Sequence, residues 1–233
     1  MSIDTLYSFR RCPYAIRARW AILNCGKQVI LREVSLKDKP QELTMVSKKS
    51  TVPVLITKEG KVIDESLNII QWAIKNCNQM LNPDFNFNLK DSSIEKIINE
   101  NDNSFKYHLD RYKYPSRYNN INVNEHHLKL NIILKKWNDK LSCFPNRSKR
   151  PWLIGNKESV ADWAIWPFVR QYRSIDPRSF DCNNDLSFLK DWLNYYLNHD
   201  LFSILMKKNI FWTKHDQPIF FPDVLTRQNP INN

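Results

Sequence analysis

The sequence predicts a two-domain protein, with an α/β domain over residues 1–80, a linker over 81–91 and an all-helical domain over 92–233 that ends in an irregular tail. Three observations support this division. Short β-prone runs alternate with helical periodicity in the first part, a polar, proline-containing stretch follows, and helical periodicity then continues nearly to the end. A chain of 233 residues is long for one average domain and sufficient for two small ones.

The composition is that of an ordinary globular protein. Apolar residues make up 42% and charged residues 25% of the chain. The sequence has no apolar run of about 18 residues and no apolar segment behind a basic N-terminus, so we expect neither a membrane span nor a signal peptide. Five cysteines at irregular spacings do not indicate a disulfide framework, and we expect a cytoplasmic location.

The formal net charge of +11 allows two interpretations. One is an anionic partner such as nucleic acid, and the other is a solvated surface with more Lys and Arg than Asp and Glu. Basic residues are spread along the chain, with only short groups such as Arg147, Lys149 and Arg150. Nucleic-acid-binding proteins usually concentrate their basic residues, so we do not expect nucleic acid as the partner.

The first 80 residues alternate strands and helices in a defined order. Pro13 opens a helix with an apolar face, and Gly26 is placed to end it. The other predicted elements are strands at Thr5–Phe9, Val29–Val34, Val52–Ile56 and Val62–Ile63, a helical segment from Pro40, and a helix after Asp64-Glu65-Ser66. The order β-α-β-α-β-β-α is that of the thioredoxin fold.

Helical periodicity dominates the remainder of the chain. One apolar stripe runs from Ile94 to Tyr112 and ends before Pro115, and a second runs from Leu130 to Phe144. A third helix begins at Ser159, where Asp162 three residues later completes a capping box, so we interpret this pair as folding residues. Further predicted helices cover Leu186–Tyr196 and the region of Leu205 and Met206; the tail from Trp212 contains Pro218 and Pro222.

Cys12 is the most informative residue for function. It precedes Pro13 at a helix start, where backbone N–H groups and the helix dipole favour an anion. Such positions lower the pKa of a thiol, in known cases to roughly 3.5–7.5. Ala15 stands where a dithiol motif would have its second cysteine, so the site can form a mixed disulfide but has no local resolving thiol. The alternative is an inert cysteine at a helix start.

Two further motifs fit a peptide ligand with free charged ends. Val52 precedes Pro53 and a strand; in thioredoxin-like folds this proline is cis, and the residue before it offers its backbone to an extended peptide. Ser66 at a helix start suits a carboxylate and Glu65 an ammonium group, although plain helix capping explains the triplet equally well. Lys39 is in reach of a second carboxylate, or is simply a surface lysine.

Together these segments resemble the cysteine-type, omega-like glutathione transferases. The resemblance rests on RRCPYAIRARWAI, LKDKP, TVPVL and DES in this order, and on SVADWAIWPFVRQY and FKYHLDRYKYP further along. The resemblance extends from about residue 4 to residue 212. The stretch FKYHLDRYKYP is similar to one in bacterial omega-like members. The resemblance implies the glutathione-transferase fold, with a thioredoxin-like N-terminal domain and a helical C-terminal domain.

The resemblance also implies a function and a site. Cys12 would form mixed disulfides, with glutathione as co-substrate and without a metal. The implied glutathione site consists of Tyr14, Lys39, Val52, Pro53, Glu65 and Ser66. The implied partners are glutathione and a small disulfide or electrophilic second substrate, and the implied assembly is a homodimer. Tyr7 and Ser8 are rivals to Cys12, since conjugating transferases use such hydroxyls to hold the glutathione thiolate.

The second substrate is expected to bind in the helical domain. Polar and aromatic groups mix at the candidate pocket residues Tyr107, His108, Arg111, Tyr112 and Trp212. Trp163 and Trp166 have helical spacing and are interpreted as core. His126 and His127 lack the spacing of a metal site.

Three functions are compatible with this sequence. The first is a glutathione-dependent thiol transferase or reductase that acts through Cys12. The second is a conjugating transferase or hydrophobic-ligand carrier with the same fold. The third is a non-enzymatic regulator of the stringent-starvation type. Residues for a complete glutathione site argue against the third, and Cys12 at the helix start favours the first.

Overall fold

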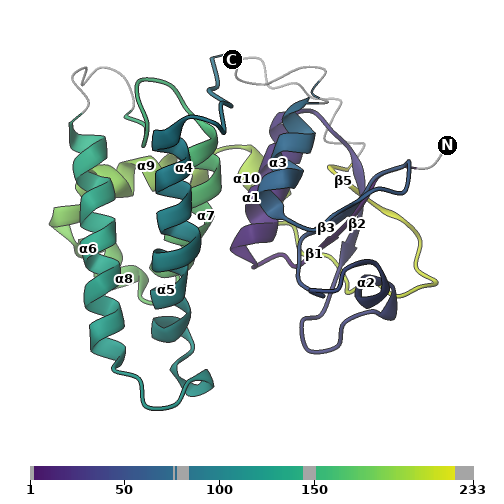
Figure 1. The fold of residues 1–233 in the computed structure, drawn as a ribbon, viewed down its shortest axis with the longest axis horizontal. Helices are drawn as coiled ribbons and strands as arrows, with labels where there is room; N and C mark the ends of the chain where they lie inside the picture. Colours follow the sequence, from purple (N-terminus) through teal and green to yellow (C-terminus); the bar gives the residue numbers. More distant parts are fainter. Residues whose placement is uncertain (1–2, 76, 78–83, 144–150, 224–233) are drawn as a thin grey trace. The chain divides into compact units, whose positions relative to one another are not determined.

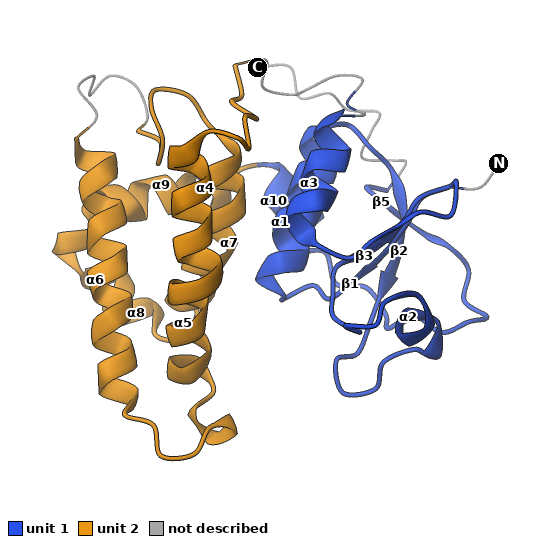
Figure 2. Ribbon diagram, in the orientation of Figure 1, with its two compact units in different colours: residues 1–83, 200–233 blue, residues 84–199 orange. Residues whose placement is uncertain are grey.

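The computed structural model describes residues 3–75, 77, 84–143 and 151–223. Two compact units divide the chain: the first combines residues 1–83 with 200–233, and the second is 84–199 (Figure 2). The start of the predicted linker, at 81–83, and the basic group at 147–150 lie outside the described residues. Each unit is considered separately below.

The first unit contains a mixed β-sheet. Its strands in the described part of the chain are β1 (Thr5–Ser8), β2 (Val29–Glu33), β3 (Val54–Ile56), β4 (Val62–Ile63) and β5 (Ile219–Phe221). Their order across the sheet is β4-β3-β1-β2-β5. β1 is parallel to β2, and the other neighbours are antiparallel. The predicted hairpin between β3 and β4 is confirmed, with Gly60 at φ +85° in its turn.

Four helices accompany this sheet in the described residues of the first unit: α1 (Pro13–Asn24), α2 (Gln41–Val46), α3 (Ser66–Lys75) and α10 (Leu201–Leu205). α1 and α3 pack side by side (Figure 1). Gly26 ends α1 as predicted, because its φ of +59° is a conformation that residues with a Cβ rarely adopt. The βαβαββα order of the N-terminal part is therefore confirmed.

The C-terminal tail departs from the prediction. The sequence predicts an irregular tail from Trp212, but β5 adds a strand to the free edge of β2, with Ile30 opposite Phe220. The Trp212 N–H donates to the Glu33 carbonyl at 2.7 Å. A run of three residues before Pro222 is too short to be recognised alone, and its partner strand lies far away in sequence.

The second unit is helical in its described part. Its elements are α4 (Ser92–Asn99), the π-helix η1 (Glu100–Phe105), α5 (Lys106–Lys113), the 3₁₀ turn η2 (Pro115–Arg117), α6 (Val123–Ser142), α7 (Val160–Arg173), α8 (Pro177–Cys182), the 3₁₀ turn η3 (Asn184–Leu186) and α9 (Ser187–Leu197). The predicted stripe from Ile94 to Tyr112 thus spans three continuous helical segments. Its π-helical middle has no sequence signal.

Aromatic side chains fill the core of the second unit. Trp163 and Trp166 are at most 1% exposed, which confirms their interpretation as core residues. The capping box of Ser159 and Asp162 is confirmed. The buried Asp162 carboxylate also accepts hydrogen bonds from the Leu153 N–H (3.0 Å) and the Trp192 indole (2.9 Å). The cap therefore also connects α7 to α9.

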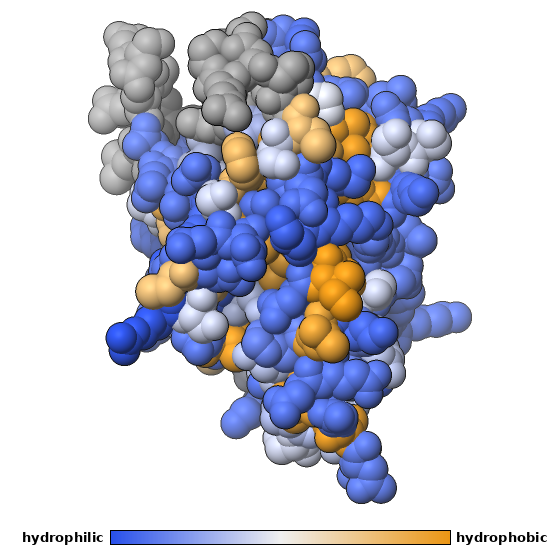
Figure 3. Space-filling view, turned by 90° about the vertical axis from the view of Figure 1, so that its left-hand side faces the viewer, coloured by the Kyte–Doolittle hydropathy of each residue, from blue (hydrophilic) through white to orange (hydrophobic). Residues whose placement is uncertain are grey.

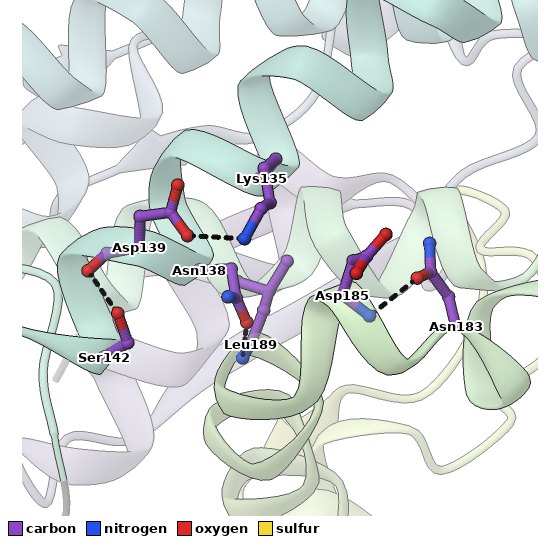
Figure 4. A network of polar contacts seen from close by, with 7 residues as sticks. All are labelled: Lys135, Asn138, Asp139, Ser142, Asn183, Asp185 and Leu189. Atoms are coloured by element: carbon purple, nitrogen blue, oxygen red, sulfur yellow. Dashed lines mark hydrogen bonds and ion pairs between the residues drawn. The ribbon is translucent and has the colours of Figure 1, made fainter.

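A polar contact also joins α6 to α9, as Figure 4 shows. The buried Asn138 amide oxygen accepts a hydrogen bond from the Leu189 N–H at 3.1 Å, which connects α6 to α9. On the outer side of α6, Lys135 forms an exposed ion pair with Asp139 at 2.8 Å. The buried hydrogen bond of Asn138 should therefore contribute more to stability than the exposed ion pair.

Candidate active site

Cys12 lies at the N-cap of α1. A hydrogen bond from the Cys12 N–H to the Phe9 carbonyl (3.0 Å) closes the turn after β1. Pro13 occupies the first helical turn, and the Cys12 side chain does not cap the helix. Its half-buried thiol instead points to the Val52 carbonyl oxygen, at 3.6 Å. A negative charge on this sulfur would lie at the positive end of the α1 dipole.

Val52 and Pro53 lie opposite the thiol, directly before β3. Their peptide bond is cis, as the sequence analysis expects for this fold. Val52 is 7% exposed and belongs to an apolar cluster with Tyr7 and Val54, against which Cys12 packs. The structure therefore brings together the cysteine and the backbone segment that the sequence predicts to hold an extended peptide.

Arg17 connects two predicted glutathione-site residues. Ser66, the first residue of α3, accepts a hydrogen bond from the Arg17 Nε at 2.9 Å. The same guanidinium lies over the Tyr14 ring, 4.9 Å from its centroid. Arg17 is only 2% exposed, so its charge acts in a poorly solvated environment. The N-terminus of α3 thus combines a hydroxyl, a helix dipole and a buried cation, a set that suits a carboxylate.

Glu65 and Lys39 are on the surface. Glu65 forms an ion pair with Lys49, and both side chains are more than half exposed. Hydrogen bonding to Glu65 raises the pKa of Lys49. An exposed pair of this kind contributes little to stability, so a ligand ammonium group could replace Lys49. Lys39 is exposed between β2 and α2, and its role toward a carboxylate stays a prediction.

Tyr7 and Ser8, the rivals to Cys12, are buried in the first unit. The Tyr7 hydroxyl accepts a hydrogen bond from Arg32, and the residue is 1% exposed. Burial raises the pKa of Tyr7, against the opposing effect of Arg32, so the phenol is neutral at neutral pH. Ser8 is fully buried. Neither hydroxyl is as accessible as the thiol of Cys12.

Trp212 joins the neighbourhood of Cys12 from the C-terminal tail. Its ring lies over the Arg32 guanidinium at 4.0 Å and edge-on to Tyr7 at 5.9 Å. It packs against the same apolar cluster as Cys12. Trp212 is therefore the predicted pocket residue that the structure places within the first unit, beside the predicted glutathione site.

Glu33 and Arg32 are residues of this neighbourhood that the sequence analysis missed. Glu33, at the end of β2, is 3% exposed and accepts the Arg10 backbone N–H at 2.5 Å. Burial raises the pKa of Glu33, against the lowering effects of Arg10 and Arg19. The glutamate thus holds the segment that leads to Cys12. The alternation in VILRE is the signal that could have found it, because it places Glu33 on the buried face with Leu31.

The other predicted pocket residues lie on α5 in the second unit. Arg111 covers the Tyr107 ring at 3.4 Å, and His108 Nδ1 lies 2.8 Å from His126 Nδ1. Burial, followed by the charge of His126, lowers the pKa of His108. The Tyr112 ring stacks on His127 at 4.7 Å. These residues form a polar, aromatic surface of α5, and their role toward a substrate stays a prediction.

On the face seen in Figure 3, hydrophobic residues form small patches in a mostly hydrophilic surface. Among the described residues, no group of three or more His, Cys, Asp or Glu side chains is placed to hold a metal ion. In the same residues, every helix is too short or too polar to cross a membrane.

Comparisons with known proteins concern the fold. Residues 6–79 match the family model described as the glutathione S-transferase N-terminal domain. No match was found among the curated proteins. The match lies within the first unit, whose elements have the thioredoxin-like order βαβαββα.

Solved structures show the same fold. The tau-class glutathione S-transferase MiGSTU of mango, Mangifera indica, is 18% identical over 88% of this chain and 93% of its own, with a TM-score of 0.71. Glutathione transferase Omega 1C of Trametes versicolor is 16% identical over 89% and 92%, with a TM-score of 0.65. Leishmania TDR1, a trimeric glutathione transferase, is 21% identical over 88% of this chain, with a TM-score of 0.68; the chain covers 46% of its length. This protein therefore has the glutathione-transferase fold.

Proposed function

We propose that the protein is an omega-like glutathione transferase that acts as a thiol transferase or reductase through a mixed disulfide at Cys12. The observation that carries the proposal is the half-buried Cys12 thiol at the N-cap of α1, 3.6 Å from the Val52 carbonyl oxygen. A helix N-terminus favours the thiolate, which is the nucleophile in disulfide exchange. The similarity to an omega transferase of Trametes versicolor supports the same class.

Glutathione would bind as an extended peptide along Val52 and Pro53. Its γ-glutamyl carboxylate would meet Ser66, with the charge of Arg17 behind the hydroxyl. Its ammonium group would displace Lys49 from Glu65, and Lys39 would meet the glycyl carboxylate. Tyr14 would line this site over Arg17.

The reaction has two disulfide exchanges. The Cys12 thiolate attacks the glutathionyl sulfur of a mixed disulfide, the S–S bond breaks, and the substrate thiolate leaves and takes up a proton. A second glutathione thiolate then attacks the sulfur bound to Cys12, which releases glutathione disulfide and restores the Cys12 thiolate. A second glutathione is required because Ala15 replaces a local resolving cysteine.

The experiment is glutathione-dependent reduction of 2-hydroxyethyl disulfide by the wild type, Cys12→Ser and Cys182→Ser. We expect the Cys12 variant to fall to the uncatalysed rate. Cys182 is exposed on α8 in the second unit, so its variant should match the wild type. Full activity of Cys12→Ser would overturn the proposal. If the wild type is also inactive, retention on immobilised glutathione distinguishes a conjugating enzyme or carrier, which binds, from a regulator, which does not.

The proposal extends to the setting of the reaction. We infer a cytoplasmic homodimer that uses glutathione with a small disulfide or electrophilic second substrate. The reducing cytoplasm supplies reduced glutathione and keeps exposed cysteines as thiols. Sedimentation of the purified protein tests the dimer directly.

A further inference from the structure

Two cysteines outside the predicted site lie in contact in the first unit. Cys25 is the C-cap of α1 and is 1% exposed, whereas Cys77 follows α3 and is half-buried. The Cys77 thiol lies 3.6 Å from the Cys25 carbonyl oxygen. Both are free thiols, at the opposite end of α1 from Cys12.

We propose that Cys25 and Cys77 are a redox-active pair that a small disulfide, such as glutathione disulfide, oxidises to an intramolecular disulfide between α1 and α3. The basis of this proposal is the contact of the Cys77 thiol with the backbone carbonyl of Cys25, which places the two cysteines side by side. It requires neither Cys12 nor any residue of the predicted glutathione site. The pair is therefore a modification site that stands independently of the proposed function.

The different exposure of the two sulfurs sets the order of the steps. The Cys77 thiolate attacks glutathione disulfide, which forms a mixed disulfide and releases one glutathione thiolate. The Cys25 thiol then loses its proton and attacks the Cys77 sulfur, which releases the second glutathione. The two thiols are oxidised by two electrons, and one glutathione disulfide becomes two glutathione molecules.

Cys25 is suited to the second step only. Burial, and then the nearby Cys77, raises the pKa of Cys25 to about 12, so it is a thiol at neutral pH and does not meet the oxidant directly. A thiol with a raised pKa is also a poor leaving group. The disulfide, once formed, should therefore resist reduction when glutathione attacks Cys77.

The cross-link would stabilise the first unit. It joins residues 52 positions apart, and a disulfide that closes a long loop restricts the unfolded chain. It would connect the far ends of the helix that begins after Cys12 and the helix that begins at Ser66. We expect the midpoint of thermal unfolding to rise by roughly 5–15 °C on oxidation.

The test is treatment of the folded protein with glutathione disulfide, alkylation of the remaining thiols, and peptide mapping under non-reducing conditions. The wild type should yield a peptide in which Cys25 and Cys77 are joined. Cys25→Ala should leave Cys77 bound to one glutathionyl group, and Cys77→Ala should leave Cys25 as an unmodified thiol. Cys12→Ser and Cys182→Ser should form the cross-link as the wild type does.

The failure of this proposal is distinguishable from failure of the proposed function, because the Cys12 variant separates them. A wild type in which Cys77 carries glutathione while Cys25 remains a thiol would overturn the proposal. A cross-link that forms only in denaturant would also overturn the proposal. So would the absence of any Cys25–Cys77 cross-link in a protein whose Cys12 is fully oxidised.

Discussion

Replacement of Asp162 by alanine should destabilise the second unit strongly. The fully buried carboxylate accepts four hydrogen bonds, from Leu153 N–H, Ser159 N–H, the Ser159 hydroxyl and the Trp192 indole. Loss of a helix cap costs about 1 kcal/mol. Each buried donor left without an acceptor, here on Leu153 and Trp192, costs about 1–3 kcal/mol. The sum is about 3–7 kcal/mol, against a typical total stability of about 5–15 kcal/mol.

Urea denaturation followed by tryptophan fluorescence measures this loss. Asp139→Ala is the matched control, because its carboxylate is 54% exposed and pairs with Lys135 on the surface, so we expect a change within about 0.5 kcal/mol. Both variants should retain Cys12 activity while folded, since Asp162 is a folding residue. An Asp162→Ala protein that loses less than about 1 kcal/mol would refute the reasoning, as would equal losses in the two variants.

Three further predictions concern the first unit. Arg17→Met should weaken the binding of S-methylglutathione, measured by calorimetry, by about 10-fold or more, because it removes the charge behind Ser66. Arg11 is exposed and serves as the control: an equal loss of affinity in Arg11→Met would show that only overall charge matters. Phe221→Ala should lower the free energy of unfolding by about 3 kcal/mol, because the ring is 4% exposed in β5, whereas Phe211→Ala, 55% exposed, should change it little. The free energy of unfolding of the wild type should fall as the pH rises above the ordinary pKa of a glutamate. Glu33→Gln should remove this fall. Burial raises the folded-state pKa of Glu33, so the folded protein favours the neutral acid, and this advantage is present at low pH and lost as pH rises through the folded pKa. Parallel stability–pH curves for Glu33→Gln and the wild type would contradict that sign.

Local chemistry explains why much of the fold was predictable. Pro13 and Gly26 delimit α1 because one lacks the N–H that a helix start does not need and the other tolerates positive φ. The capping box at Ser159 and the hairpin turn at Gly60 are likewise short-range features. Each depends on residues a few positions apart, so it can be recognised from the sequence alone.

Part of the candidate site was predictable for the same reason. Cys12, Pro53 and Ser66 were identified because each lies at an element boundary with a recognisable motif. The contact of Arg17 with Ser66, across 49 positions, had no such signal. Sequence analysis identified Ser66 but not the guanidinium that donates to its hydroxyl.

The sequence alone therefore determined the order of the N-terminal elements, the ends of α1 and the position of Cys12 at a helix start. Only the tertiary structure decided that the tail returns as β5, that Trp212 packs on the cluster around Cys12, and that Cys25 meets Cys77. These contacts join segments far apart in the chain. Their free energy comes from burial and hydrogen bonding that no local pattern specifies, because it exists only when the two segments meet.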